Sequence, residues 1–265
     1  MHIWQSLTQR VRMASVGRKR HIPNVKLLDS STIPLSLNLY EWAAFRSTKS
    51  GLKLYLLVEF ISEQDIHPEK LTVTPAERSD VLEAPRFITE PGVTYVIDRG
   101  YYDFRLFDQW CKDGIFFATR IKSNTVVDIR DFIYEDLQQN GFRESLVIIG
   151  SAQKKMENHL RLVEFYNDTG KLYQIVTNRF DLPASRWQIE LMFKWMKQHL
   201  QVNHIHSRTE QAAWKQLYIA MIAYSLLLLL RLETKTRLTL YQLFTKLRAL
   251  LFSDFEELLE VLQPT

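Results

Sequence analysis

Short apolar runs alternate with short stretches of helical periodicity over the first 121 residues of the chain. The apolar runs are short and rich in Val, Ile, Leu, Phe and Tyr, which is typical of strands in a sheet. The strands predicted in this way cover residues 25–29, 52–60, 70–74, 94–97 and 115–121. Helices or helical turns are predicted at residues 4–13, 39–46, 76–82 and 104–112. Strands that alternate with helices predict an α/β core.

The pattern changes between residues 122 and 180. Four strand-like runs lie there, at residues 125–129, 146–149, 160–166 and 172–177. Turn residues separate them, including Asn140-Gly141 and Asn167-Asp168-Thr169-Gly170. Such residues favour tight turns between antiparallel strands. The segment therefore predicts a β-rich insertion in the α/β core.

Helical periodicity returns after Pro183, and helices are predicted at residues 186–200, 209–232 and 239–262. The most apolar run, residues 217–230, is shorter than a membrane span and contains two tyrosines and a serine, so we expect a buried core helix and no membrane partner. The predicted parts of the chain are a basic arm (1–24), the first part of the core (25–121), the insertion (122–180), a core helix (181–207) and C-terminal helices (208–265).

The predicted helix after Pro183 carries two stripes of side chains. An apolar stripe consists of Ile189, Met192, Phe193, Met196 and Leu200. A narrower stripe beside it consists of Arg186, Glu190, Lys194 and Lys197. One interpretation is an exposed ladder of ion pairs, since Glu190 and Lys194 have favourable i,i+4 spacing. The other is a metal-binding carboxylate flanked by cations that bind phosphates.

Composition is that of an ordinary folded protein, with 46% hydrophobic and 24% charged residues and a formal net charge of +4. The distribution of charge is more informative, because residues 1–28 contain no acidic residue. Their basic residues are Arg10, Arg12, Arg18, Lys19, Arg20 and Lys26. This arm favours an anionic partner such as nucleic acid or, equally, a solvated terminal arm.

Cysteine usage excludes two classes of site. The single cysteine, Cys111, allows neither an internal disulfide framework nor a cysteine-based zinc site. We expect it to be a core residue of a helix. The N-terminus shows no basic region followed by an apolar segment, so we predict no signal peptide.

Two aspartates follow short apolar strands. Asp29 ends the run 25–29 and precedes a Ser-Ser-Thr turn, and Asp98 ends the run 94–97. If these strands are neighbours in one sheet, the two carboxylates converge at its edge, and Glu190 could join them. Three clustered carboxylates suit Mg²⁺ or Mn²⁺, and two such ions could support phosphoryl transfer. The alternative for each aspartate is a turn or helix cap.

Other acidic residues near predicted elements have simpler explanations. Asp103 stands where it would cap the helix 104–112. We expect this residue, Glu59 and Asp80 to be structural rather than part of a metal site.

Two stretches resemble the signatures of DDE transposases of bacterial insertion-sequence family four. They are Asp98-Arg99-Gly100-Tyr101 and Arg186-x-x-x-Glu190-x-x-x-x-x-x-Lys197. The segment Leu28-Asp29-Ser30-Ser31-Thr32-Ile33 is similar to the one that carries the first aspartate in that family. The resemblance runs from about residue 23 to residue 208.

The resemblance implies an α/β, RNase H-like catalytic core with a β-rich insertion and a C-terminal helical region. It implies that Asp29, Asp98 and Glu190 bind Mg²⁺ or Mn²⁺, as two ions. It also implies cleavage at the ends of an insertion sequence and attack by the freed 3′-hydroxyl on target DNA.

The resemblance further implies double-stranded DNA as partner, a homodimer on that DNA, and a bacterial cytoplasmic, nucleoid-associated location. The expected DNA-binding residues are Arg99, Arg186, Trp187, Lys194 and Lys197. Trp187 is either a stacking surface for an unstacked base or a packing residue at the domain edge.

The chain departs from the family pattern in two ways. Pro183 stands where the family has a tyrosine, so one contact to the DNA end is expected to be missing or replaced. Only a short basic arm precedes Asp29, which predicts an N-terminally truncated copy with weak recognition of transposon ends. Two alternatives stay open: a metal-dependent nuclease without strand transfer, and an inactive remnant that only binds DNA.

Overall fold

The structure is a computed structural model that describes residues 2–15, 24–35, 44–46, 49–62, 65–136, 142–166, 170–181, 209–250 and 256. The helices are α1 (His2–Ser15), α2 (Asp80–Phe87), the short 3₁₀ helix η2 (Arg99–Tyr101), α3 (Phe104–Lys112), α5 (Glu210–Thr234) and α6 (Leu240–Ala249). The strands are β1 (Val25–Leu35), β2 (Ala44–Arg46), β3 (Lys49–Phe60), β4 (Ile66–Pro75), β5 (Thr94–Ile97), β6 (Phe116–Arg120), β7 (Val127–Asp136), β8 (Phe142–Ser151), β9 (Lys154–Lys155), β10 (Leu160–Tyr166) and β11 (Leu172–Thr177).

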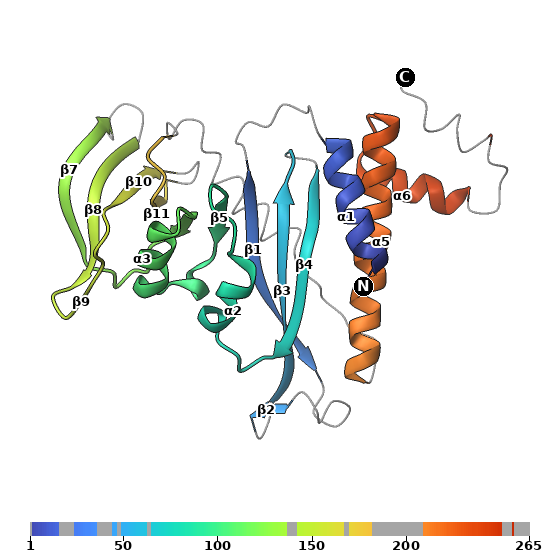
Figure 1. Cartoon of the computed structure of the whole chain (residues 1–265), viewed down its shortest axis with the longest axis horizontal. Coiled ribbons are helices and arrows are strands. Elements are labelled where there is room, and N and C mark those ends of the chain that lie inside the picture. Colours follow the sequence, from blue (N-terminus) through green and yellow to red (C-terminus); the bar gives the residue numbers. More distant parts are fainter. Residues whose placement is uncertain are drawn as a thin grey trace.

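The centre of the fold is a mixed sheet in which β1 lies between β3 and β5. β1 and β3 are antiparallel, and β4 pairs antiparallel with the other edge of β3. β5 is parallel to β1, and β6 is parallel to β5. The helices α2 and α3 precede and follow β5, as parallel strands require a crossover connection. The predicted α/β core is confirmed by this arrangement (Figure 1).

The strands after residue 122 continue the same sheet. β11 pairs antiparallel with β6, and the order then runs β10, β8 and β7, each antiparallel to the next. Figure 1 shows this antiparallel part at the end of the molecule opposite to α1 and α5. The predicted antiparallel strands are therefore present, and the β6–β11 pairing joins them edge-on to the α/β core.

Alternating side chains divide the core between the two faces of the sheet. Leu27 belongs to the apolar cluster that includes Trp4 of α1 and Leu217 of α5. Its neighbour Leu28 belongs to the apolar cluster on the opposite face. That cluster includes Phe87 of α2 and Phe107 of α3. This is the two-residue period of a strand buried on both faces. Full burial of such a side chain stabilises the fold by about 1.5–3 kcal/mol.

The long helix α5 is buried on one side only. Leu217, Leu228 and Leu232 are buried, whereas Ile219 is 66% and Leu226 49% exposed. The helix packs along α1 (Figure 1). By length and composition alone its residues 211–234 could cross a membrane, a criterion that core helices also meet. The prediction of a buried core helix is therefore correct for one face and wrong for the other.

Three predicted boundaries are corrected. β1 does not end at Asp29 but runs on through Pro34, because β3 pairs with it over that whole length. Pro34 is tolerated because β5 ends at Ile97, which leaves that side of β1 without a partner strand in the described part of the sheet. Within the predicted turn 39–46, Ala44–Arg46 is a strand, and the helix predicted at 76–82 is instead α2 (Asp80–Phe87).

Candidate functional site

Asp29 and Asp98 lie side by side on neighbouring parallel strands. The last paired residues of β1 and β5 are Leu28 and Ile97, and each aspartate is the next residue along its strand direction. The condition stated from the sequence, that the two strands are neighbours in one sheet, is met. The prediction that both aspartates end a strand is correct for Asp98 but wrong for Asp29, which lies in the middle of β1 opposite Leu56 of β3.

The two aspartates of the segment after β5 have different roles. Asp103 accepts hydrogen bonds from the backbone amides of Arg105 and Leu106, so it caps α3 as predicted. Asp98 occupies the equivalent position before η2, yet its side chain makes no capping hydrogen bond. Asp29 lies in a strand and therefore caps no turn. Neither Asp29 nor Asp98 therefore acts as the turn or helix cap that was the alternative to a metal-binding role.

The electrostatics of the pair show the effect of bringing two acids together. Burial and then the negative charge of Asp98 raise the pKa of Asp29 to about 6, and the more distant charge of Asp80 adds to this. The Ser30 backbone and the Ser31 hydroxyl, whose Oγ lies 3.4 Å from Asp29 Oδ2, act in the opposite direction. Among the residues that the structure describes, no ion pair joins a cation to Asp29 or Asp98. Two neighbouring carboxylates supply oxygen ligands of the kind that could hold a divalent cation.

Of the remaining predicted site residues, the structure describes only Arg99. Arg99 follows Asp98 directly and is exposed. The third predicted ligand, Glu190, lies outside the described residues, as do Pro183 and the predicted DNA-binding residues Arg186, Trp187, Lys194 and Lys197. Within the described ranges no three Asp, Glu, His or Cys residues are grouped to hold a metal ion. Two carboxylates of the predicted set are therefore brought together here.

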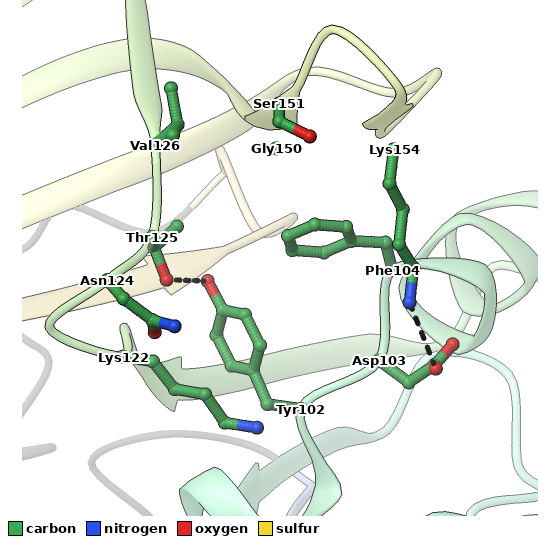
Figure 2. A pocket seen from close by; sticks show the side chains of 10 residues that line it. All are labelled: Tyr102, Asp103, Phe104, Lys122, Asn124, Thr125, Val126, Gly150, Ser151 and Lys154. Carbon is green, nitrogen blue, oxygen red and sulfur yellow. Dashed lines mark hydrogen bonds and ion pairs between the residues drawn. The ribbon is translucent and has the colours of Figure 1, made fainter.

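A cavity of about 320 Å³ opens beside the segment that follows Asp98 (Figure 2). On one side of it, the Thr125 hydroxyl donates a hydrogen bond to the Tyr102 hydroxyl oxygen at 3.2 Å. Lys122 Nζ lies 5.3 Å from the Tyr102 ring, and Lys154 Nζ lies 5.8 Å from the Phe104 ring. Lysines beside aromatic rings offer contacts to phosphates and bases. This cavity was not predicted, because its walls come from separate loops.

Asp80 is a residue that sequence reasoning treated as structural but that the fold places next to the site. It is the first residue of α2, and its Oδ1 lies 2.8 Å from Lys53 Nζ of β3. Its other carboxylate oxygen lies against Gly100, two residues after Asp98. No spacing rule in the sequence signals this contact.

The other end of β1 carries charges of both signs. Lys26 Nζ lies 2.9 Å from Glu69 Oε2 and 2.5 Å from Glu90 Oε1. Arg12 of α1 reaches the same Glu69, at 2.8 Å, and lies 3.5 Å from Glu59. These pairs tie α1, β1 and β4 together.

The chain is similar to a known family of proteins. A family model described as a transposase DDE domain matches residues 20–226. The matched range contains β1, β5 and residue Glu190.

Two curated proteins named as transposases are similar to the chain. y4zB of Sinorhizobium fredii is 30% identical over 216 residues, which cover 77% of this chain and 60% of that protein. The protein named for insertion sequence element IS5377 of Geobacillus stearothermophilus is 27% identical over 221 residues, covering 80% of this chain and 58% of that protein. The chain thus spans about 60% of the length of these relatives.

A solved structure is also similar at a low level. The NurA nuclease from Sulfolobus solfataricus is matched with a TM-score of 0.34 and 10% identity, over 83% of this chain and 92% of that chain. A similarity of that size supports no argument about fold or chemistry.

Proposed function

Because this chain belongs to the family of transposase DDE domains, we propose that it cleaves DNA strands at the ends of an insertion sequence and joins the freed 3′ end to target DNA, its 3′-hydroxyl attacking a target phosphate and displacing the 3′-oxygen of the target strand. The observation that carries the proposal is the placement of Asp29 beside Asp98 on two parallel strands. Cleavage and transfer are both phosphoryl transfers, and both need charge stabilisation where an oxygen attacks and another leaves.

The strand order supports an RNase H-like core as part of this proposal. β4, β3 and β1 form an antiparallel unit, and β5 and β6 extend it in parallel with β1. The candidate site then lies at the carboxyl end of β5, where α/β sheets usually bind their ligands. The antiparallel strands β7–β11 would correspond to the β-rich insertion.

The donor set fits a divalent metal ion. Asp29 and Asp98 supply hard oxygen ligands, and the raised pKa of Asp29 reflects burial and like charge that a cation would relieve. We propose that Glu190 completes the set, and that the site takes Mg²⁺ or Mn²⁺, as two ions. The metal would supply Lewis-acid stabilisation of the reacting oxygens and activation of the attacking hydroxyl. DDE transposase domains use divalent metals, which makes this the natural cofactor class.

The proposed site residues would have separate roles in metal binding and in DNA binding. Asp29 and Asp98, held by the backbone of two paired strands, fix the metal-binding oxygens with little freedom to move. Arg99, exposed beside Asp98, would contact a DNA phosphate, and Arg186, Lys194 and Lys197 would contact phosphates from the helix predicted around Glu190. Trp187 would stack on an unpaired base or pack at the domain edge. Double-stranded DNA is the proposed partner, bound by a homodimer in the bacterial cytoplasm at the nucleoid.

The test is nicking of supercoiled plasmid with Mg²⁺ or Mn²⁺. We expect metal-dependent nicking by the wild-type chain and its loss, by at least about 100-fold, in Asp98→Asn and Glu190→Gln. Glu157→Gln is the matched control, because Glu157 is exposed and distant in sequence from both residues. DNA binding without nicking under every metal condition would contradict the proposal and favour a DNA-binding remnant.

A second assay separates transfer from hydrolysis. A labelled oligonucleotide that carries an insertion-sequence end with a free 3′-hydroxyl is mixed with target plasmid. A transposase domain joins the label to the plasmid, whereas a nuclease without strand transfer nicks the plasmid and leaves it unlabelled.

A further inference from the structure

A largely buried ion pair lies next to the turn that follows Asp98. Lys53 Nζ of β3 and Asp80 Oδ1 of α2 are 2.8 Å apart, and their side chains are 16% and 11% exposed. Lys53 is opposite Thr32 of β1, so it belongs to the strand next to that of Asp29. The pair therefore connects the central antiparallel strands with the first turn of α2. Because both groups are largely removed from water, each depends on the other for compensation.

The second oxygen of Asp80 reaches the turn itself. A Cβ atom added to Gly100 would lie near Asp80 Oδ2, at 2.3 Å, and 3.2 Å from its Cγ. No real Cβ is found at the first distance, so either Asp80 or the turn would have to move. The backbone of Gly100 is outside the left-handed region, so its conformation does not by itself call for glycine. The close approach of Asp80 is what excludes a side chain at this position.

The same contact explains how the turn is held. The described contacts of η2 with α2 bring the first turn of that helix against residues 99–101. Asp98 has no capping hydrogen bond of its own to fix it. Lys53 in turn restricts the movement of Asp80, because separating the ion pair would leave two largely buried charges without compensation. The position of the turn after β5 thus depends on a chain of contacts from Lys53 through Asp80 to Gly100.

We propose that Asp80 and Lys53 are a positioning pair that holds the Asp98–Arg99–Gly100 turn, and with it the carboxylate of Asp98 next to Asp29. Asp80 acts through Gly100 and touches no reacting atom. The inference rests on the proposed function in one respect, namely that Asp98 binds the metal. A displacement of a ligand by a fraction of an ångström is enough to weaken metal binding and to lower the rate substantially.

The test is a double-mutant cycle between positions 80 and 100. Gly100→Ala is expected to weaken Mn²⁺ binding, measured by calorimetry, and to lower metal-dependent nicking, each by about tenfold or more. Asp80→Ala is expected to have a smaller effect, because it loosens the turn without displacing it. The double variant Asp80→Ala/Gly100→Ala is expected to match Asp80→Ala alone, since the added methyl group then meets no carboxylate.

Further variants separate positioning from simple loss of stability. Lys53→Arg keeps the ion pair and should retain Mn²⁺ affinity near the wild-type value, whereas Lys53→Met should lower it. Glu77→Gln is the matched control for removing an acid near α2, because Glu77 is exposed and precedes the helix. A structural role alone would lower the melting temperature in these variants and leave Mn²⁺ affinity, measured well below that temperature, unchanged.

A measurement without metal keeps this inference distinct from the proposed function. The backbone amide signals of Asp98 and Arg99 in a ¹⁵N-correlated NMR spectrum should shift in Gly100→Ala and return to their Asp80→Ala positions in the double variant. That result supports the positioning pair even if the wild-type chain neither binds Mn²⁺ through Asp98 nor nicks DNA. Equal effects of Gly100→Ala in both backgrounds, on the NMR signals and on Mn²⁺ affinity, would overturn the inference.

Discussion

Two positions in β1, Lys26 near its start and Asp29 near its middle, differ in how their charges are compensated. At Lys26 the ammonium group lies within 2.9 Å of Glu69 and within 2.5 Å of Glu90, so unlike charges are paired. Three residues further along, Asp29 has another carboxylate, Asp98, as its neighbour on the adjacent strand. Both positions pair with β3, but the pairing of β1 with β5 includes Lys26 and ends at Leu28, one residue before Asp29. The two positions therefore differ both in charge arrangement and in their place relative to the end of β5.

The pKa values of Lys26 and Asp29 are both raised, but for opposite reasons. Burial alone would lower the pKa of Lys26, but hydrogen bonds to Glu90 and Glu69 raise it, so its charged form is favoured. Burial and Asp98 raise the pKa of Asp29 to about 6, so its charged form is disfavoured. The charge of Lys26 is compensated within the folded chain by its two carboxylate partners. The like charges of Asp29 and Asp98 cost stability unless a cation neutralises them, and this is the feature on which the proposed metal site rests.

The largest expected effect comes from breaking the ion pairs of Lys26. Lys26→Met would remove one of the two cations that contact the Glu69 carboxylate, which is 7% exposed, and would leave Arg12 at 2.8 Å. We expect a loss of about 3–5 kcal/mol in the free energy of unfolding, measured with urea at pH 7. Lys26→Met/Glu69→Gln should recover a large part of that loss. An equal loss in the double variant would mean that packing around Lys26, and not its charge, is important.

A smaller effect of opposite sign is expected at Asp29, beside the like charge of Asp98. The pKa of Asp29 is about 6 in the folded chain, against a reference value of 3.8. The folded state therefore binds a proton more tightly than the unfolded state, so the stability linked to this group is fully present below pH ~4 and is lost as the pH rises through about 6. Since Asp29 and Asp98 interact, the proton belongs to the pair.

Asp29→Asn should therefore stabilise the metal-free protein by about 2–3 kcal/mol at pH 7.5 and by much less at pH 4.5. Urea unfolding with a chelator present, at both pH values, measures the difference between the two proteins and cancels other titrating groups. Added Mn²⁺ should stabilise the wild-type chain at pH 7.5 more than it stabilises the variant. A gain in stability that is the same at both pH values would show that the charge of Asp29 is not its cause.

The smallest effect is expected for an exposed ion pair, which shows how much the burial of Lys26 contributes. Arg10 of α1 and Glu233 of α5 form an ion pair at 3.2 Å, with side chains 59% and 51% exposed. Arg10→Met should change the free energy of unfolding by about 0.5 kcal/mol or less, because water screens the pair. It is the control for Lys26→Met, since both remove a cation from an ion pair. Similar losses in the two variants would show that burial does not decide the value of these pairs.

Local signals in the sequence predicted many elements well. The strands β5, β10 and β11 and the helix α3 have the predicted bounds, because short apolar runs, turn residues and the Asp103 cap act within a few residues. Thr209 accepts a hydrogen bond from Ala212 at the start of α5, where a helix was predicted to begin. Signals of this kind need no information about the rest of the chain.

The errors occurred where distant segments decide. β1 continues beyond Asp29 because the long strand β3 pairs with it, although Ser30, Ser31 and Pro34 resemble a turn. The outer face of α5 is exposed because, in the described part of the chain, other elements pack on only one side of this helix. Its sequence is apolar all round, so it does not show which side is covered. In both cases the local pattern was ambiguous and tertiary packing resolved it.

The sequence by itself determined the kinds of element, the positions of Asp29 and Asp98 near the ends of apolar runs, and the family signatures that point to Glu190. Those properties depend on residue type and short-range spacing. Only the tertiary structure decided that Leu28 pairs with Ile97, which places the two aspartates side by side, and that Asp80 lies against Gly100. Parallel strand register and helix-to-turn contacts join residues that are 20 to 70 positions apart. They are set by how the whole core packs, and no local pattern encodes them.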